Sequence, residues 1–259
     1  GGQRGRRLHA AVTAACQGTP LATGAVAGPV TVTGNNTLTG NITVTAGTYT
    51  INNATIGISP TQSITVNNGA TLIITNSHVY ACSNMWQGIV VNPGSRVRIT
   101  NSLIEDAVIG IDDSNGGVAY TTPSASVQVT GSVFNCNRTG INQSNYQSAV
   151  GTNYTSFTNF QVNNSVFTCR CGITYPLSMG QLNTYSGVLA NPSLNDYYSV
   201  ANLQLADLKT PYLGVPPLEG IHFENDGPQS NASPSTFAYN VGVGSTSPSI
   251  FDNHTYGHD

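Results

Sequence analysis

Four stretches of the sequence can be aligned on a serine, and this internal repeat limits how the chain can fold more than any other feature. Each stretch has apolar residues five and three positions before the serine and another apolar residue two positions after it. The aligned serines, at intervals of 25, 30 and 33 residues, are Ser77, Ser102, Ser132 and Ser165. A repeat of this length, built from short β-type segments, is typical of a solenoid whose successive coils stack.

The repeat predicts three strands per coil, separated by turns. Alternation of apolar and polar side chains on both sides of the serine predicts two half-buried strands. A Gly-Ile pair after each of these segments marks a third strand. If the coils stack in register, equivalent apolar residues form continuous interior columns and the strands pair in parallel. We therefore expect the isoleucines of the four pairs to share one column: Ile89, Ile111, Ile141 and Ile173.

The composition argues against two classes of partner. Charged residues make up 7% of the chain, against about 25% in an ordinary soluble protein. The formal net charge is −3, and three of the eight basic residues are Arg4, Arg6 and Arg7. The rest of the chain therefore lacks the basic stripe with which a protein binds nucleic acid. No apolar run approaches the roughly 18 residues of a membrane-spanning helix, so membrane insertion is not expected.

The repeat also divides the chain into segments. Residues 1–29 show weak periodicity and are interpreted as an N-terminal leading segment or cap, followed by the solenoid over residues 30–259. Residues 174–219 carry no repeat and are predicted to be an insertion. The repeat resumes at Ser249–Gly257 as an incomplete last coil. Because an uncapped coil leaves strand edges unpaired, we expect either more coils beyond Asp259 or end-to-end contact with another copy.

Two of the five cysteines occupy equivalent positions in the repeat. Cys136 and Cys169 each lie four residues after the aligned serine, so we expect them on neighbouring coils about 4.8 Å apart. That spacing allows either a disulfide or two stacked, buried thiols. No metal-type Cys-x-x-Cys pair occurs, and neither a metal site nor a cofactor is predicted.

Several of these motifs occur together in a known family. The segments from Gly69 and Gly94 to the aligned serine, the segment Cys82–Ile89 and the later Gly-Ile pairs resemble β-helix segments of large Bacteroidota surface proteins. The resemblance covers roughly residues 30–173. It implies an all-β fold, a right-handed parallel β-helix like that of pectate lyases. It also implies export, since such proteins usually carry a type IX secretion sorting domain, but it assigns no activity.

Residues with catalytic potential are few. The best candidates for a carboxylate pair are Asp112 and Asp113. Glycoside hydrolysis needs two carboxylates about 5–9 Å apart across one groove, yet the positions equivalent to Asp112 in the next coils are Asn142 and Thr174. No acidic column forms, so we expect the two aspartates to serve a turn. Trp86 is a candidate for stacking on a sugar, although its place beside a Gly-Ile pair favours packing at a coil corner.

The sequence favours a non-catalytic function as a rigid stalk, filament component or adhesive segment of a secreted or cell-surface protein. Its expected partners are further coils, other copies of the chain, or glycans. The main alternative is a carbohydrate-active enzyme, a polysaccharide lyase or glycoside hydrolase, whose groove is bordered by residues 174–219. A trimeric phage-type fibre is a second alternative. Continuous polar ladders between coils would favour the stalk, and an acidic cluster near the insertion would favour the enzyme.

Overall fold

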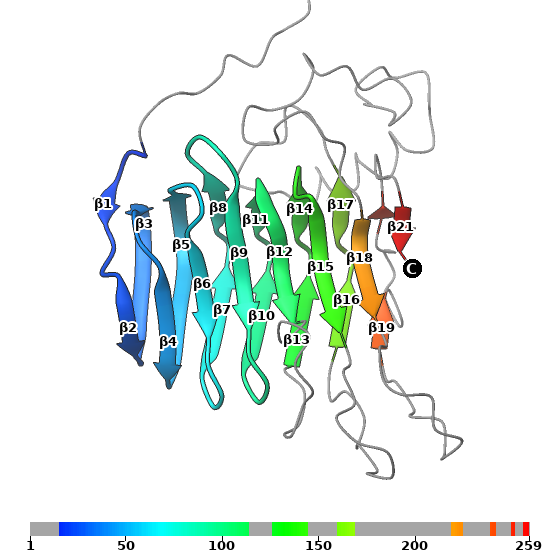
Figure 1. The fold of residues 1–259 in the computed structure, drawn as a ribbon, viewed down its shortest axis with the longest axis horizontal. Helices are drawn as coiled ribbons and strands as arrows, with labels where there is room; N and C mark the ends of the chain where they lie inside the picture. The colour runs from blue at the N-terminus through cyan, green and yellow to red at the C-terminus, as the bar shows by residue number, and fades with distance from the viewer. Residues whose placement is uncertain are drawn as a thin grey trace, which may run out of the picture.

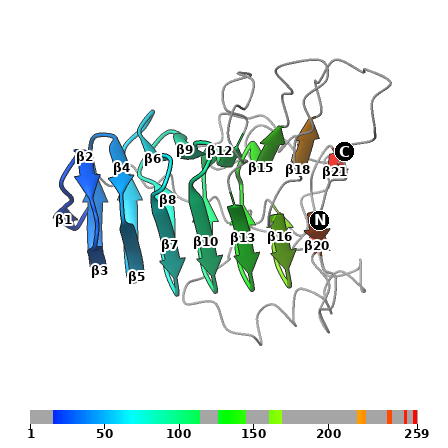
Figure 2. The same cartoon turned by 90° about the horizontal axis from the view of Figure 1, so that it is seen from below.

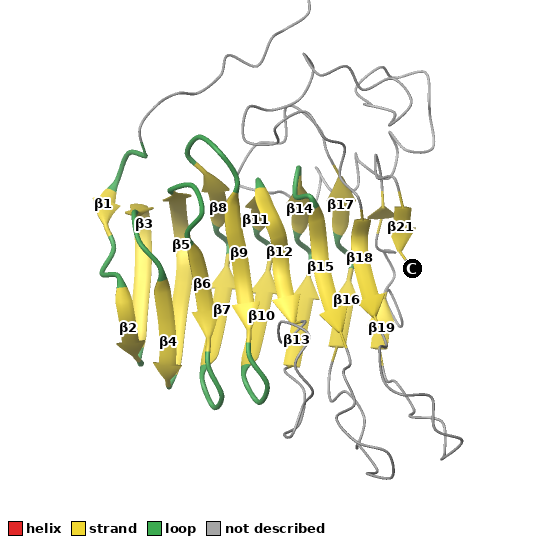
Figure 3. Ribbon diagram, viewed as in Figure 1, coloured by secondary structure: helices red, strands yellow, loops and turns green. Residues whose placement is uncertain are grey.

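The regular structure of this chain consists of parallel β-strands in two sheets. The computed structural model describes residues 16–113, 126–144, 160–168, 219–224, 239–241, 250–251 and 256–258. Over these ranges every regular element is a strand (Figure 3), and no helix there is long and apolar enough to cross a membrane. The sheets contain 13 and 8 strands, and they form two layers that face each other (Figures 1 and 2). The predicted all-β class with parallel pairing is therefore confirmed.

The larger sheet, sheet A, divides into two branches. Its first strands are β1 (Thr19–Pro20), β3 (Val30–Leu38) and β5 (Thr48–Ile58). The lower branch, named from its place in Figure 1, contains β7 (Thr71–Thr75), β10 (Arg96–Thr100), β13 (Ser126–Thr130), β16 (Phe160–Asn163) and β19 (Tyr239–Val241). The upper branch contains β8 (His78–Ala81), β11 (Leu103–Glu105), β14 (Val133–Asn135), β17 (Val166–Thr168) and β20 (Ile250–Phe251). The branches meet at β5, which pairs with both β7 and β8.

The smaller sheet, sheet B, supplies the third strand of each repeat. Its strands are β2 (Gly24–Ala27), β4 (Ile42–Ala46), β6 (Ser63–Val66), β9 (Trp86–Val91), β12 (Ala107–Asp113), β15 (Thr139–Ser144), β18 (Glu219–Glu224) and β21 (Tyr256–His258). From β7 onward the chain passes from the lower branch to the upper branch and then to sheet B, and it repeats this order through β21. The predicted sequence of three strands per repeat is confirmed.

Equivalent apolar residues form the interior columns that the repeat predicts. The columns of the two branches are Ile74-Ile99-Val129-Val162 and Val79-Ile104-Phe134-Phe167. These side chains are at most 1% exposed. Full burial of each stabilises the fold by about 1.5–3 kcal/mol. The rings of Phe134 and Phe167 also stack, with their centroids 5.0 Å apart.

The isoleucine column of sheet B differs from the prediction at its fourth position. Ile89, Ile111 and Ile141 are consecutive register partners, but the partner after Ile141 is Ile221 of β18. Ile173, which was expected there, lies outside the described residues. Ile173 and Ile221 each follow a glycine in a Gly-Ile pair, and the repeat pattern alone does not show which of the two pairs continues the sheet. The predicted insertion also lies outside the described residues, apart from its last residue, which begins β18.

Both ends of the repeat region contain more strands than the pattern indicated. The segment interpreted as a leading segment or cap, residues 1–29, contains β1 and β2, which pair in sheets A and B respectively. The last repeat contains β19 in addition to the strands within Ser249–Gly257. Short strands with few apolar residues, such as β1 and β19, give little periodic signal.

A left-handed residue forms the corner between the two branches in five repeats of the described chain. The corner residues, with φ between +46° and +59°, are Asn53, Asn76, Asn101, Gly131 and Asn164. Glycine and asparagine adopt this conformation more readily than other residues. At Gly131 an added Cβ would lie 2.6 Å from Oδ1 of Asn101, so a side chain there would require the Asn101 amide to move.

A serine follows four of these corner residues, Asn76, Asn101, Gly131 and Asn164, and links one repeat to the preceding one. The hydroxyl of Ser102 donates a hydrogen bond to the carbonyl of Thr100 at 2.8 Å and accepts one from the N–H of Ser77 at 3.1 Å. The same pair of bonds recurs at the other aligned serines, Ser77, Ser132 and Ser165. All four side chains are fully buried. This serine ladder satisfies backbone N–H groups at a bend, where an unpaired group would be costly.

Candidate functional site

The described structure contains a buried cluster of ionisable side chains on the outer face of the upper branch. Side chains alternate between the two faces of a strand, so Glu105 points away from the interior that its neighbour Ile104 helps to fill. Parallel pairing sets Glu105 beside Asn135 of the next repeat, and Leu103 beside His78 of the preceding one. Three successive repeats thus bring His78, Glu105 and Asn135 together.

The carboxylate of Glu105 has a hydrogen-bond partner on each oxygen. Oε1 accepts a hydrogen bond from Nδ2 of Asn135 at 2.6 Å, and Oε2 lies 2.6 Å from Nε2 of His78. The side chain of Glu105 is only 7% exposed, whereas that of His78 is 20% exposed. A buried carboxylate is tolerated only when such partners replace its hydration. Of these two hydrogen-bonded side chains, His78 is the one that solvent reaches more readily.

Two aromatic residues border this cluster. The ring centroid of Tyr80 lies 4.9 Å from that of His78. Burial, and secondarily the charge of Glu105, raises the pKa of Tyr80 above its ordinary value of 10.0. On the other side, Nε1 of Trp86 donates a hydrogen bond to the backbone carbonyl of Glu105 at 2.8 Å. The cluster is therefore fixed by backbone as well as side-chain contacts.

The chemistry available to this cluster is limited. Glycoside hydrolysis requires a second carboxylate across a groove, but both oxygens of Glu105 are already occupied by His78 and Asn135. Within the part of the chain that the structure describes, no group of three or more His, Cys, Asp or Glu residues is suited to hold a metal ion. This cluster was not predicted from the sequence. The sequence feature that indicated it is a polar residue at the same position, three residues after the aligned serine, in three successive repeats: Tyr80, Glu105 and Asn135.

The two candidate catalytic aspartates lie on opposite faces of one strand. Asp112 and Asp113 are the last two residues of β12 rather than residues of a turn, which corrects the prediction. Asp112 is half-buried, and its Oδ1 accepts a hydrogen bond from Asn142 at 3.2 Å. Asp113 is fully buried, and its Oδ2 accepts one from Gln143 at 2.6 Å. Because consecutive strand residues point to opposite faces, the two carboxylates do not converge on one groove.

The candidate sugar-stacking residue, Trp86, has no exposed surface. Its side chain is 0% exposed, and its register partner in β12 is Ala107. A ring that stacks on a sugar must present one face to solvent. Trp86 therefore packs in the interior, and its indole N–H is already bonded to the Glu105 carbonyl.

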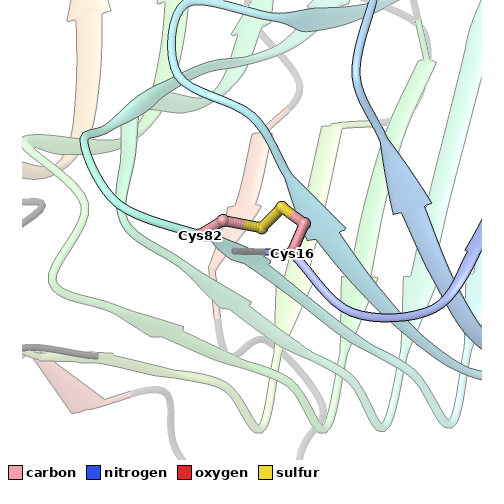
Figure 4. Close-up of a disulfide and its surroundings, with 2 residues drawn as sticks. All are labelled: Cys16 and Cys82. Carbon is pink, nitrogen blue, oxygen red and sulfur yellow. A yellow bond between two sulfur atoms is a disulfide. The ribbon is translucent and has the colours of Figure 1, made fainter. Parts of the chain in front are cut away.

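The structure contains a disulfide that the repeat did not predict. A disulfide joins Cys16, which precedes β1, to Cys82, which follows β8 (Figure 4), with Cα atoms 5.2 Å apart. Cys136 is buried, with its Sγ 3.5 Å from Oδ1 of Asn135. Cys169 lies outside the described residues, so the predicted proximity of Cys136 and Cys169 stays a prediction. The sequence analysis missed this disulfide because Cys16 lies outside the repeat. Gly57, the second-to-last residue of β5, lies against this disulfide, since an added Cβ there would be 2.8 Å from Sγ of Cys82.

Comparison with known proteins provides no assignment for these residues. No protein-family model matches the chain, and neither the curated proteins nor the solved structures contain a match. The functional argument therefore rests on the geometry of the repeats and their surfaces.

Proposed function

We propose that this chain forms a right-handed parallel β-helix that serves as a rigid structural or adhesive segment of a secreted or cell-surface protein. The connection between successive parallel strands of one sheet is right-handed in about 98% of known cases. Each repeat here crosses to the opposite sheet before it returns, which supports that handedness. The stacked repeats make a rod whose length grows with the number of repeats.

The serine ladder is the observation that carries the structural function. Its four hydroxyls link consecutive repeats through bonds of 3.1–3.3 Å to buried N–H groups. On the two faces of sheet B, Asn142 and Gln143 add amide contacts to Asp112 and Asp113 of the preceding repeat. Hydrogen bonds between consecutive repeats make the stack resist bending and shear. Because these polar groups are paired with one another, they do not present a reactive group to solvent. This arrangement suits a stalk better than a catalytic groove.

The disulfide between Cys16 and Cys82 supports an extracellular location. Disulfides persist in oxidising compartments and are rare in the cytosol. The resemblance to Bacteroidota surface proteins favours the same location and a type IX export route. Under this proposal the partners of the chain are further coils, other copies, or glycans on a neighbouring surface.

Surface labelling tests the proposed location and role. Antibodies against the folded repeats should label intact, unpermeabilised cells of the source organism or its secreted material, and protease treatment of intact cells should remove the signal. Labelling only after permeabilisation would overturn the proposal. The same preparations should contain the Cys16–Cys82 disulfide when peptides are mapped without reduction.

A carbohydrate-active enzyme is the competing function, and the His78–Glu105 pair is the observation that favours it. The purified protein should fail to depolymerise a panel of neutral and acidic polysaccharides. Cleavage of any of them that is lost in Glu105→Gln or Asp112→Asn, but kept in Asn142→Gln, would replace the structural proposal with an enzymatic one.

A further inference from the structure

The lower branch of sheet A has an outer face that is open to solvent, unlike the outer face of the upper branch. We call it the polar face, and its central side chains are Thr71, Ile73, Thr75, Arg96, Arg98, Thr100, Ser126, Gln128 and Thr130. None of these side chains is buried. On the upper branch, by contrast, the outward residues Leu103, Val133 and Asn135 are at most 1% exposed.

Two arginines lie side by side at the centre of the polar face. Arg96 and Arg98 are both exposed and stand two residues apart on β10, which places their Cα atoms about 6.6 Å apart with side chains on the same face. Their register partners are Thr71 and Ser126 for Arg96, and Ile73 and Gln128 for Arg98. No acidic residue belongs to the polar face as defined. Among the described residues, the contact between a basic and an acidic side chain is that of His78 with Glu105, on the other branch. No carboxylate of the described residues therefore pairs with the guanidinium of Arg96 or Arg98.

We propose that the polar face binds an acidic polysaccharide through the carboxylates of its uronate residues. Arginine presents a planar fork of N–H donors that matches a carboxylate in a bidentate contact. The surrounding hydroxyl and amide groups donate and accept hydrogen bonds, as sugar hydroxyls require, and Ile73 offers an apolar contact. The inference rests on the proposed adhesive function and names the ligand class that the adhesive surface takes.

The chemistry of this face favours a polysaccharide over other anionic polymers. A surface for single-stranded nucleic acid combines basic groups with aromatic rings on which bases stack, and the polar face has no aromatic residue. Binding to an anionic membrane would require a cluster of several basic residues or an inserted apolar segment. The two arginine side chains lie on one strand, and the hydroxyl groups around them lie on neighbouring strands about 4.8 Å away. This arrangement fits an extended chain of acidic sugars.

Polygalacturonate is the test ligand, and its fully methyl-esterified form is the matched neutral control. The folded protein should bind polygalacturonate at low ionic strength in titration calorimetry, less tightly as salt is added, and should not bind the ester. The double variant Arg96→Gln/Arg98→Gln should bind at least about tenfold more weakly. Arg138→Gln removes an exposed arginine that lies outside the polar face, and this variant should bind like the wild type.

A second variant separates charge from geometry. Arg96→Lys/Arg98→Lys keeps both charges but loses the forks, and its affinity should fall between those of the wild type and the glutamine variant. Far-UV circular dichroism and thermal melting should be unchanged in all variants, because the substituted side chains are exposed.

Several outcomes would overturn the inference. They are no binding of polygalacturonate by the wild type, equal binding of the ester, equal losses in the Arg96→Gln/Arg98→Gln and Arg138→Gln variants, and binding of single-stranded DNA as tight as that of polygalacturonate. These failures are distinguishable from failure of the proposed function. Surface labelling without polygalacturonate binding removes only this inference, whereas binding by a protein found solely inside cells removes the adhesive function.

Discussion

At the scale of single residues, the corners of the repeat carry the most specific chemistry. The backbone must turn between the two branches, and left-handed asparagine or glycine residues make that turn. The turn leaves an N–H group that the sheet cannot pair, and the serine hydroxyl of the next repeat accepts its hydrogen bond. A serine at this position therefore has a role that a larger or apolar residue cannot fill.

Ser102→Ala tests this role. The change leaves the buried N–H of Ser77 without its partner. The carbonyl of Thr100 loses the hydroxyl but keeps its hydrogen bond from the N–H of Asn76. We expect the free energy of unfolding to fall by about 1–3 kcal/mol, measured as a lower urea midpoint with an unchanged m-value. Ser126→Ala is the control, because that side chain lies half-buried on the polar face. Equal losses in both variants would contradict the role of the ladder.

The two tyrosines with raised pKa values should make the fold sensitive to alkaline pH. Burial raises the pKa of Tyr49 and Tyr80 above 10.0, and the Glu105 charge adds to the effect at Tyr80. Below pH 10.0 both groups are protonated in the folded and unfolded states, so their contribution is fully present. As pH rises further, the unfolded chain loses these protons first, and stability falls.

Tyr80→Phe checks this prediction. Urea unfolding of the wild type should show lower stability at about pH 10.5 than at about pH 9. The variant should lose less over that interval, since one of the groups responsible is gone. An identical pH dependence in the variant would show that Tyr80 ionises equally easily in both states.

At the scale of elements, the glycines of sheet B allow the strands to approach the upper branch closely. A Cβ added at Gly110 would collide with the carbonyl of Gly140 and lie 2.9 Å from Cδ1 of Phe134. The same relation recurs one repeat later, where Gly140 faces Phe167. The Gly-Ile pair thus combines a residue that makes room for an aromatic ring with one that fills the interior column.

Gly110→Ala should be strongly destabilising for this reason. The added methyl group meets backbone and a packed ring, and overpacking of this kind costs about 1–3 kcal/mol or more. Gly40→Ala is the control, since its Cβ would meet only the side chain of Thr23, at 3.1 Å or more. Thermal melting should show a clearly larger drop for Gly110→Ala, and similar drops in the two variants would contradict the close approach.

At the scale of the whole molecule, one covalent link joins distant parts of the stack. The Cys16–Cys82 disulfide closes a loop over a sequence separation of 66 residues and ties the start of the described chain to the end of β8. The intervening segment contains the first strands of both sheets. Cross-linking a loop of this length stabilises the folded state by about 4 kcal/mol in the chain-entropy model.

Cys16→Ser/Cys82→Ser should lower the free energy of unfolding by a similar amount, about 4 kcal/mol. Urea unfolding with and without a reducing agent provides the internal control, because the reductant should destabilise the wild type and leave the variant unchanged. A reductant effect that persists in the variant would point to a different disulfide.

The sequence alone determined the repeat, its three strands and most of its interior columns. Apolar residues that recur at fixed distances from a serine can be buried together only if the repeats stack in register, as Ile74 and Ile99 do. Strand alternation also settled which side chains point inward. These properties follow from local periodicity, which is written directly in the order of residues.

Tertiary structure decided which repeats become neighbours, and therefore which polar residues meet. The choice of Ile221 after Ile141, the Cys16–Cys82 disulfide and the contact of Glu105 with His78 and Asn135 all join residues from different repeats. The side chain of Trp86 is buried for the same reason: its environment is made by β12 as well as by its own strand. Periodicity specifies the face of a strand on which a residue lies. The residues that it contacts depend on which strand pairs with its own, and the sequence separation of paired strands varies from repeat to repeat.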